Sequence, residues 1–586
     1  MTETAAEQEN LFAKVLVGCR SPAVALTIFT LLAVSSLARK SATFDEALLM
    51  ASGARFLRTW DNSVNPENPP LLKAFYALPT MFMTDLEIPP VSHRLRYSYK
   101  MADEFAYGEQ FLYGAPKRHG RHKTLLFLCR CMAVLAGVLL GLALYRVAAV
   151  VWGRRVAAVL LWIYALSPNV LAHTRLFTPD LGCTLFVFLT VVSLHLVTKR
   201  GQWRHALWLG LALGGALLSK FTGVLLLPCI AVQLLVHLAL TGAWRQRQLW
   251  RRLVPQLLFS GVLALVLVNA FYLGRGFGRS LRASEYRSPL VRKLQNVPLL
   301  RSMPLPVPAD YVRGFDIVAN NNRPGFPNIF LGKLHPQGGS WWYYYIVVLA
   351  SKTPLALLGC VVWGMICGLR GHRRRRLLLA EFAVVPVLLF LNFSFVAYRQ
   401  LGLRYILPLW PFFILAIGFA VRQALRKGEG AARRRRVGGA LLALYALTAL
   451  SAYPDYLSYF NGAAGGSRHG WKRLVASNID WGQDLPALAA WQRRNGTPDM
   501  FVLYHGQAPL DTYEVNAIPW GALPLPPYLA IGVTNYYLMQ DAPLVRFLRD
   551  HGHPIAYVGG SIHVHALDNA TLSQFAQWAA GGIGSP

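Results

Sequence analysis

Two adjacent carboxylates, Asp45 and Glu46, follow the first apolar segment of the chain. A carboxylate can take the proton of a hydroxyl group that attacks an electrophilic carbon, and carboxylates are also ligands for divalent cations. Acidic residues are scarce here, with 27 Asp and Glu against 59 Lys and Arg. The pair is therefore interpreted as a catalytic base with a partner, or alternatively as two acidic residues at the first turn of a helix.

A third carboxylate, Asp180, directly follows Pro179 at the start of a later apolar segment, where it also fits a helix N-cap. Basic residues that could hold an anion are spread along the chain. Lys220 and Arg404 could equally be anchors at a membrane surface. The basic candidates are Lys73, Arg175, Lys220, Lys352, Arg399 and Arg404.

One base and several cations suit one reaction in particular, the transfer of a sugar from a lipid phosphate. The attacking hydroxyl needs a carboxylate within hydrogen-bond reach, and the leaving phosphate needs positive charge. A single displacement uses one carboxylate base, whereas a hydrolase uses two carboxylates. The site must then lie at a membrane surface, because the lipid tail of the donor stays in the bilayer.

The composition indicates a membrane protein, since 54% of the residues are hydrophobic. Apolar runs of the length that crosses a bilayer recur about eleven times. They are expected at about 22–38, 124–144, 154–171, 179–198, 204–219, 221–241, 253–274, 350–369, 377–397, 402–421 and 437–454.

Arginine and lysine concentrate in alternate loops, such as 245–252, 373–376 and 422–436. With eleven spans these loops share one side, which the positive-inside rule makes cytoplasmic. The N-terminus is then expected in the cytoplasm and the C-terminus outside, which is the periplasm for a bacterial inner membrane. The same loops account for the net charge of +32, so nucleic acid is not an expected partner.

The opposite side holds two long loops, about 39–123 and about 275–349. The first is expected to contain interfacial amphipathic helices at 44–60 and 71–82, separated by Pro69-Pro70. These loops and the spans make up a predicted transmembrane domain of residues 1–456.

The polar tail, residues 457–586, is predicted to form a small external α/β domain. The expected strands are 501–504, 528–533 and 555–558, and the expected helices are 485–494 and 542–549. His551, His553, His563 and His565 gather there, but neither Cys nor carboxylate completes a zinc site with them.

A set of short motifs occurs in order along residues 40–490. The motifs are Phe44-Asp45-Glu46, Asn68-Pro69-Pro70-Leu71-Leu72-Lys73, Thr178-Pro179-Asp180, Leu218-Ser219-Lys220, Lys352-Thr353-Pro354, Gly402-Leu403-Arg404-Tyr405 and Asp480-Trp481-Gly482-Gln483-Asp484. Through them the chain resembles the GT-C glycosyltransferases that use polyprenyl-phosphate sugars. The nearest groups are the protein O-mannosyltransferases and the bacterial lipid A aminoarabinose transferases, of the glycosyltransferase family 39 type.

The resemblance implies a GT-C fold and an inverting hexosyl- or pentosyltransferase with Asp45 as base. It also implies that Arg404, with Lys220 or Lys352, lies near the donor phosphate. Residue type alone keeps further candidates open: Glu46 beside the base, Arg175 for the phosphate, and Lys73 and Asp180 elsewhere in the site. Asp480, Trp481, Gln483 and Asp484 could cover the site, but a role in organising the tail is the favoured interpretation.

The partners follow from the same resemblance: a polyprenyl-phosphate-linked sugar and the bilayer. The acceptor stays open between lipid, glycan and protein, because the loop 275–349 lacks an evident β-trefoil insert. The only cofactor suggested is a divalent cation shared by Asp45, Glu46 and a phosphate. The alternative functions are a transporter or flippase of a lipid-linked glycan, and a receptor built around the tail.

Overall fold

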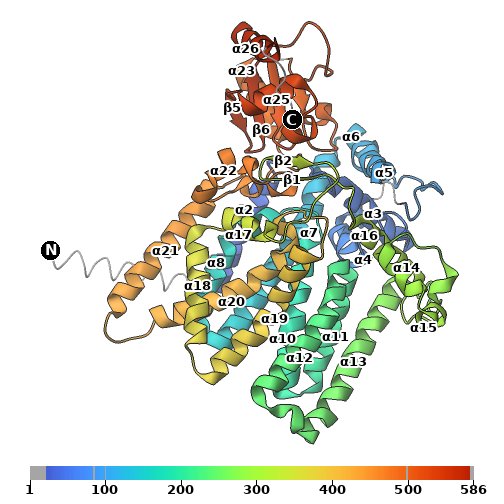
Figure 1. Ribbon diagram of the computed structural model, residues 1–586, viewed down its shortest axis with the longest axis vertical. Helices are drawn as coiled ribbons and strands as arrows, with labels where there is room; N and C mark the ends of the chain where they lie inside the picture. Colours follow the sequence, from blue (N-terminus) through green and yellow to red (C-terminus); the bar gives the residue numbers. More distant parts are fainter. Residues whose placement is uncertain (1–20, 84–85, 99–100, 497–498, 581–586) are drawn as a thin grey trace.

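The computed structural model of the protein describes residues 21–83, 86–98, 101–496 and 499–580. Long helices fill one end of the molecule, and a sheet-containing C-terminal domain stands at the other (Figure 1). The predicted class, a polytopic helical membrane protein with a small C-terminal α/β domain, is confirmed. The predicted cytoplasmic N-terminus lies outside the described residues.

Helices occupy all eleven segments expected to cross the bilayer, but the count of eleven spans is not confirmed. In the described part of the chain, six helices are long and apolar enough to cross, or up to eight if each of two bent pairs counts as one span. The six are α7 (His122–Trp152), α10 (Asp180–Arg200), η2 with α12 (Phe221–Thr241), α13 (Arg247–Phe271), α19 (Arg373–Phe395) and η6 with α20 (Leu407–Ala424).

Three of the other expected spans fall short for simple reasons. Helix α2 (Pro22–Leu37) has 16 residues and α11 (Trp203–Ser219) has 17, fewer than the roughly 20 that a straight crossing needs. Helix α21 (Ala431–Ser451) has four consecutive arginines, Arg433 to Arg436, near its start. These arginines shorten the apolar part of α21.

The two bent pairs break at prolines. Helices α8 (Arg154–Ala165) and α9 (Pro168–Thr174) meet at 63°, and α17 (Tyr344–Lys352) and α18 (Leu355–Leu369) meet at 114° around Pro354. Proline lacks the N–H that would continue the helix and disfavours the helical conformation of the residue before it. The expected span at about 350–369 therefore begins inside a bent pair of helices.

The connection between α12 and α13, drawn in green, lies at the end of the helices farthest from the C-terminal domain (Figure 1). It carries Arg245, in the short helix η3 (Ala243–Arg245). The arginine-rich connection between α18 and α19 lies at the same end (Figure 1). These two basic connections therefore share one side of the molecule.

The predicted helix at 44–60 is α3 (Glu46–Thr59), but it is not an amphipathic surface helix. Residues 46–54 are all buried, because α4 (Pro70–Tyr76) and α5 (Met101–Tyr113) pack closely on it. A Cβ on Gly53 would meet the carbonyl oxygen of Lys73 at 2.2 Å, and a Cβ on Gly108 would meet the backbone of Leu48 at 2.5 Å. Small residues thus let the three helices approach and fix the start of α3.

The helix predicted at 71–82 divides into α4, which Pro70 begins, and a 3₁₀ helix, η1 (Leu78–Phe82). The second long loop supplies α14 (Pro289–Gln295), α16 (Ala309–Asn321) and the hairpin of β1 (Asn328–Phe330) and β2 (Lys333–His335). Short 3₁₀ turns fill the bends, including η2 (Phe221–Leu225) before α12 (Leu226–Thr241), η5 (Leu403–Tyr405) and η6 (Leu407–Leu409).

The C-terminal domain contains a four-stranded sheet of order β3-β4-β6-β5. Strand β4 pairs in parallel with β3 and antiparallel with β6, which pairs antiparallel with β5. The three strands and two helices predicted there are present, whereas β6 and α26 were not predicted as elements. The bounds are β3 (Phe501–Leu503), β4 (Tyr528–Gly532), β5 (Ala556–Val558), β6 (Ile562–Ala566), α23 (Leu485–Asn495), α25 (Pro543–Asp550) and α26 (Asn569–Ala580).

The chain entering this domain runs along the segment that precedes α3. The main-chain N–H groups of Ser41 and Phe44 donate to the carbonyls of Gln483 (3.0 Å) and Trp481 (3.0 Å). Lys40 is ion-paired with Asp455 and Asp484, and its side chain is 3% exposed. The position of Asp45 therefore depends on residues more than four hundred positions away in sequence.

Candidate active site

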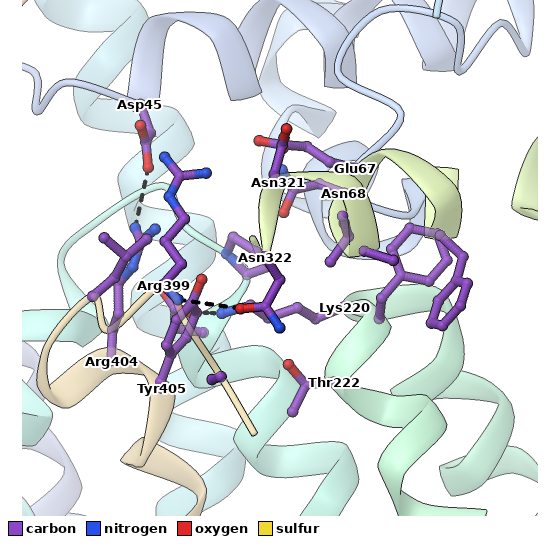
Figure 2. A pocket seen from close by; sticks show the side chains of 18 of the residues that line it. Asp45, Glu67, Asn68, Lys220, Thr222, Asn321, Asn322, Arg399, Arg404 and Tyr405 are labelled. Atoms are coloured by element: carbon purple, nitrogen blue, oxygen red, sulfur yellow. Dashed lines mark hydrogen bonds and ion pairs between the residues drawn. The ribbon is translucent and has the colours of Figure 1, made fainter. Parts of the chain in front are cut away.

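A cavity of about 290 Å³ lies between the start of α3, the loop before α4, the N-terminus of α10, η2, the end of α16 and the chain from α19 to η5. Polar side chains from all these elements line it (Figure 2). They are Asp45, Asn65, Glu67, Asn68, Glu104, Thr178, Asp180, Lys220, Thr222, Asn321, Asn322, Asn392, Arg399, Arg404 and Tyr405.

Asp45 forms an ion pair across the cavity with Arg404, whose Nη1 lies 3.1 Å from Asp45 Oδ2 (Figure 2). The side chains are 29% and 14% exposed, so both groups can reach a ligand. Asp45 occupies the N-cap position of α3, but within the described residues its side chain makes no capping hydrogen bond. The helix-capping alternative therefore does not describe Asp45.

Arg404 is held by aromatic rings and by the backbone of η5. Its guanidinium carbon lies 4.6 Å from the ring centroid of Trp481 and 5.8 Å from that of Tyr405. Burial opposes its charge, but the charges of Asp180 and Asp45 outweigh burial and raise the pKa of Arg404. Arg404 is therefore a permanent cation.

Asp180 and Lys220 form a second ion pair in the same cavity, with 2.7 Å between Oδ1 and Nζ. Asp180 is the first residue of α10, and Lys220 links α11 to η2. The Lys220 ammonium also lies 4.5 Å from the ring centroid of Tyr405. Among the described residues Asp180 makes no capping bond, so its carboxylate serves the cavity and not the helix end.

Glu46 points away from the cavity and is completely buried. It accepts hydrogen bonds from Arg130 (2.5 and 2.9 Å) and from the main-chain N–H groups of Thr43 and Phe177 (both 2.7 Å). Burial alone would raise its pKa, but the Arg130 charge and these bonds leave the pKa of Glu46 lowered. Glu46 thus fastens α3 to α7 and to the chain before α10.

Lys352, Lys73 and Arg175 are buried outside the cavity lining. Lys352 Nζ donates to two main-chain carbonyls, including that of Asn478 at 2.6 Å. Lys73 Nζ donates to the carbonyl of Asn65 at 2.9 Å, and burial lowers the pKa of Lys73 to about 7. Arg175 is 1% exposed, and no nitrogen of its guanidinium finds a hydrogen-bond partner in the described part of the chain.

Several residues at the cavity were not among the sequence candidates. Glu67 and Asn321 line it. Trp481, in contrast, was a sequence candidate for covering the site, and it packs on Arg404. His505 stacks on Phe44 with 5.1 Å between ring centroids, and burial lowers the pKa of His505 to about 4. Only Glu67 had a visible signal, its place just before Asn68-Pro69-Pro70.

Asp480, Gln483 and Asp484 are buried below the surface between the C-terminal domain and the helices. Asp480 accepts from the main-chain N–H of Thr534 at 3.0 Å, and burial raises the pKa of Asp480 to about 7. Within the described residues, no group of three or more His, Cys, Asp or Glu side chains has the arrangement of a metal site. His563 and His565 instead share hydrogen bonds with the hydroxyl of Tyr536, at 3.1 and 2.5 Å.

No curated protein sequence matches the chain. Two crystal structures of ArnT from Cupriavidus metallidurans are similar to it. The apo structure is 13% identical, with a TM-score of 0.47, and the match covers 96% of this chain and 99% of that chain. The structure bound to undecaprenyl phosphate is 14% identical, with a TM-score of 0.44, and the match covers 96% and 98%.

A family model adds evidence from the sequence. It matches residues 123–272, which include α10, α11 and Lys220, one of the cations that line the cavity. The resemblance predicted from the motifs is confirmed over this segment, because residues 123–272 carry the sequence signature of the dolichyl-phosphate-mannose-protein mannosyltransferases.

Proposed function

We propose that this protein is an inverting glycosyltransferase of the membrane. It moves a sugar from a polyprenyl-phosphate donor to an acceptor hydroxyl, and Asp45 is the general base. The observation that carries the proposal is the cavity itself, which holds Asp45 together with the cations Lys220, Arg399 and Arg404. The match of residues 123–272 to a mannosyltransferase family supports it.

The two ion pairs suit a single displacement. When a phosphate enters, Arg404 and Lys220 can bind its oxygens, and Asp45 becomes free to accept a proton. The acceptor oxygen then attacks the anomeric carbon while the bond from that carbon to the phosphate oxygen breaks. The electron pair stays on the phosphate, where the cations stabilise it, and the acceptor proton passes to Asp45. Attack opposite the leaving group inverts the anomeric centre.

The apolar part of the lining suits the lipid tail of such a donor. Leu225, Leu290, Phe393 and Val396 line the cavity beside its charged groups. Leu290 is 50% exposed and Val396 is 62% exposed, which leaves apolar surface open at the cavity. An isoprenoid chain could follow these side chains from the bilayer to the cations.

The cavity and the basic connections suggest the orientation. Helices α3 and α16, which contribute to the cavity lining, lie toward the C-terminal domain, while the α12–α13 and α18–α19 connections lie at the far end of the helices (Figure 1). These connections carry Arg245 and lead into Arg373. By the positive-inside rule we place the far end in the cytoplasm. The catalytic unit, residues 1–456, then works on the external or periplasmic face, and residues 457–586 form an external domain.

The test is mass spectrometry of envelope lipids from cells that lack the protein, supplemented with variants. Unconsumed polyprenyl-phosphate sugar should accumulate in the deletion strain and return to normal with the wild-type chain. Asp45→Asn keeps the shape of the side chain but removes the base, so it should leave the lipid accumulated. Asp103→Asn, an exposed carboxylate on α5, is the matched control. Full complementation by Asp45→Asn would refute the assignment of the base.

A further inference from the structure

The cations of the cavity lie on one side of it, where Arg404 and Lys220 are paired with Asp45 and Asp180. The cations Arg399 and Arg404 come from the chain that follows α19, and Lys220 comes from the end of α11. Glu67, Asn68 and Asn321 lie together on another side of the cavity (Figure 2). A phosphate is attracted to the first group and repelled by the carboxylate of Glu67. The two sides of the cavity therefore select different parts of a ligand.

The chemistry of the second side suits hydroxyl groups. Glu67 Oε2 accepts a hydrogen bond from Asn321 Nδ2 at 3.2 Å, and Glu67 Oε1 accepts one from Asn65 Nδ2 at 3.5 Å. These bonds use two of the roughly four lone-pair sites of the carboxylate and one of the two N–H donors of the Asn321 amide. The remaining acceptors and donors of the pair lie side by side, and adjacent hydroxyls of a sugar ring present donors and acceptors in the same way.

The loop that carries Glu67 is held in place by buried contacts. Asn65 adopts a left-handed backbone conformation (φ 51°) and donates its main-chain N–H to Glu104 at 3.1 Å. Its carbonyl accepts from Lys73, and its side-chain oxygen accepts from Asn68 Nδ2 at 2.9 Å. The side chains of Glu67 and Asn68 are thus presented on a preformed loop, as a binding site requires.

Glu67 and Asn321 belong to the two long loops, far apart in sequence, so their contact closes the cavity between the first loop and α16. Apolar Phe315 and Val318 of α16 and Phe221 of η2 line the same region. Aromatic and apolar surface next to paired hydrogen-bonding groups is suited to the ring of a carbohydrate, which has apolar C–H faces and a polar edge.

We propose that Glu67, Asn68 and Asn321 form the subsite for the transferred sugar, and that they select a sugar that has adjacent hydroxyls and no negative charge. This inference rests on the proposed function, since the phosphate of the same donor must occupy the side of Arg404 and Lys220. A sugar that carries a carboxylate, such as a uronic acid, is excluded by the charge of Glu67.

The test compares binding of two kinds of lipid to the full-length protein in nanodiscs. The first is undecaprenyl phosphate, and the second is undecaprenyl phosphate carrying mannose, glucose or galactose, of which the tightest is used. Glu67→Gln and Asn321→Ala should each weaken binding of the hexosyl lipid about tenfold or more, because a hydrogen bond with a charged partner is lost. Binding of bare undecaprenyl phosphate should stay unchanged.

The matched controls are Glu285→Gln and Asn296→Ala, exposed residues of the second long loop outside the cavity lining, which should bind both lipids as the wild type does. Equal weakening of both lipids, or no weakening of either, would overturn the subsite while leaving the proposed function intact. A wild-type protein that binds neither lipid would overturn the proposed function and the subsite together.

Discussion

At the scale of single residues, the site depends on charges that are matched in pairs. Asp45 with Arg404, and Asp180 with Lys220, neutralise one another in the cavity, while Glu46 and Arg130 do so below it. A buried charge without a partner would be expensive. The two cavity pairs are partly accessible and can exchange their partners for a ligand, whereas the Glu46 pair is sealed and can only support structure.

The role of Arg404 predicts a large loss of catalysis when its guanidinium is removed. Arg404→Ala should lower kcat about a hundredfold or more, since one preorganised donor to developing charge is typically worth that much. Arg404→Lys should recover only part of the loss, because an ammonium cannot bind a phosphate in bidentate fashion. The measurement is turnover of polyprenyl-phosphate sugar by purified protein, with the exposed Arg282→Ala as control. Unchanged kcat and KM in Arg404→Ala would remove Arg404 from the site.

Local sequence predicted part of this site, and the division has a physical reason. Asp45, Asp180, Lys220 and Arg404 each stand at an element boundary, where the chain can aim a short charged group into a cavity. Glu46 and Lys352 stand at similar boundaries, but Glu46 is paired with Arg130 and Lys352 donates to the carbonyl of Asn478, partners that lie far away in sequence. Sequence patterns reveal a charge but not its distant partner, so they could not separate the two groups.

At the scale of elements, hydrophobic runs predicted where helices lie better than how they cross. Every expected span contains a helix, yet α2 and α11 are short and two segments bend at prolines. Helix α3 lies where a helix was predicted, but its expected position at the surface was wrong. Its polar positions suggested a surface helix, but α4 and α5 cover it through contacts at Gly53 and Gly108. Tertiary packing, which no local pattern encodes, decided the burial of α3.

The loop of residues 477–484 is an element that contacts the surroundings of the proposed catalytic groups as well as the C-terminal domain. Asn478 Oδ1 accepts from the main-chain N–H of Leu403 at 3.1 Å, and the carbonyl of Trp481 accepts from Phe44. The loop thus contacts Phe44 and Leu403, the residues that directly precede Asp45 and Arg404 in the sequence. It connects the C-terminal domain directly to the proposed catalytic groups.

The indole of Trp481 is therefore expected to position Arg404. Trp481→Ala should lower kcat about fivefold, in line with the roughly 1 kcal/mol of a cation–π contact, with a smaller effect on KM. Trp481→Phe keeps an aromatic face and should recover most of the activity, a rescue that a merely destabilised fold would not show. Trp520→Ala, a half-exposed tryptophan of the same domain, is the control. Equal losses in the Ala and Phe variants would contradict a positioning role.

At the scale of the whole molecule, buried ion pairs join parts that the sequence keeps distant. Arg130 on α7 binds Glu46 and also donates to the carbonyls of Lys40 and Ser41. Lys40 in turn pairs with Asp455 and Asp484 at the base of the C-terminal domain. Membrane helices, first loop and tail are thus linked through one network of charges directly beneath the cavity.

This network predicts how stability depends on pH. The pKa of Glu46 is lowered in the folded protein, so its contribution is present above the unfolded value of about 4.5 and is lost as the pH falls through the folded value. Glu46→Gln leaves Arg130 buried without a charge partner and should cost about 3–5 kcal/mol at pH 7. Because the variant has no carboxylate to protonate, its apparent Tm should fall less steeply than that of the wild type below pH 4.5. Thermal unfolding in detergent between pH 3 and 7 measures both effects, with the exposed Glu87→Gln as control. A Glu46→Gln protein that is as stable as the control at pH 7 would show that the network is not what holds the three parts together.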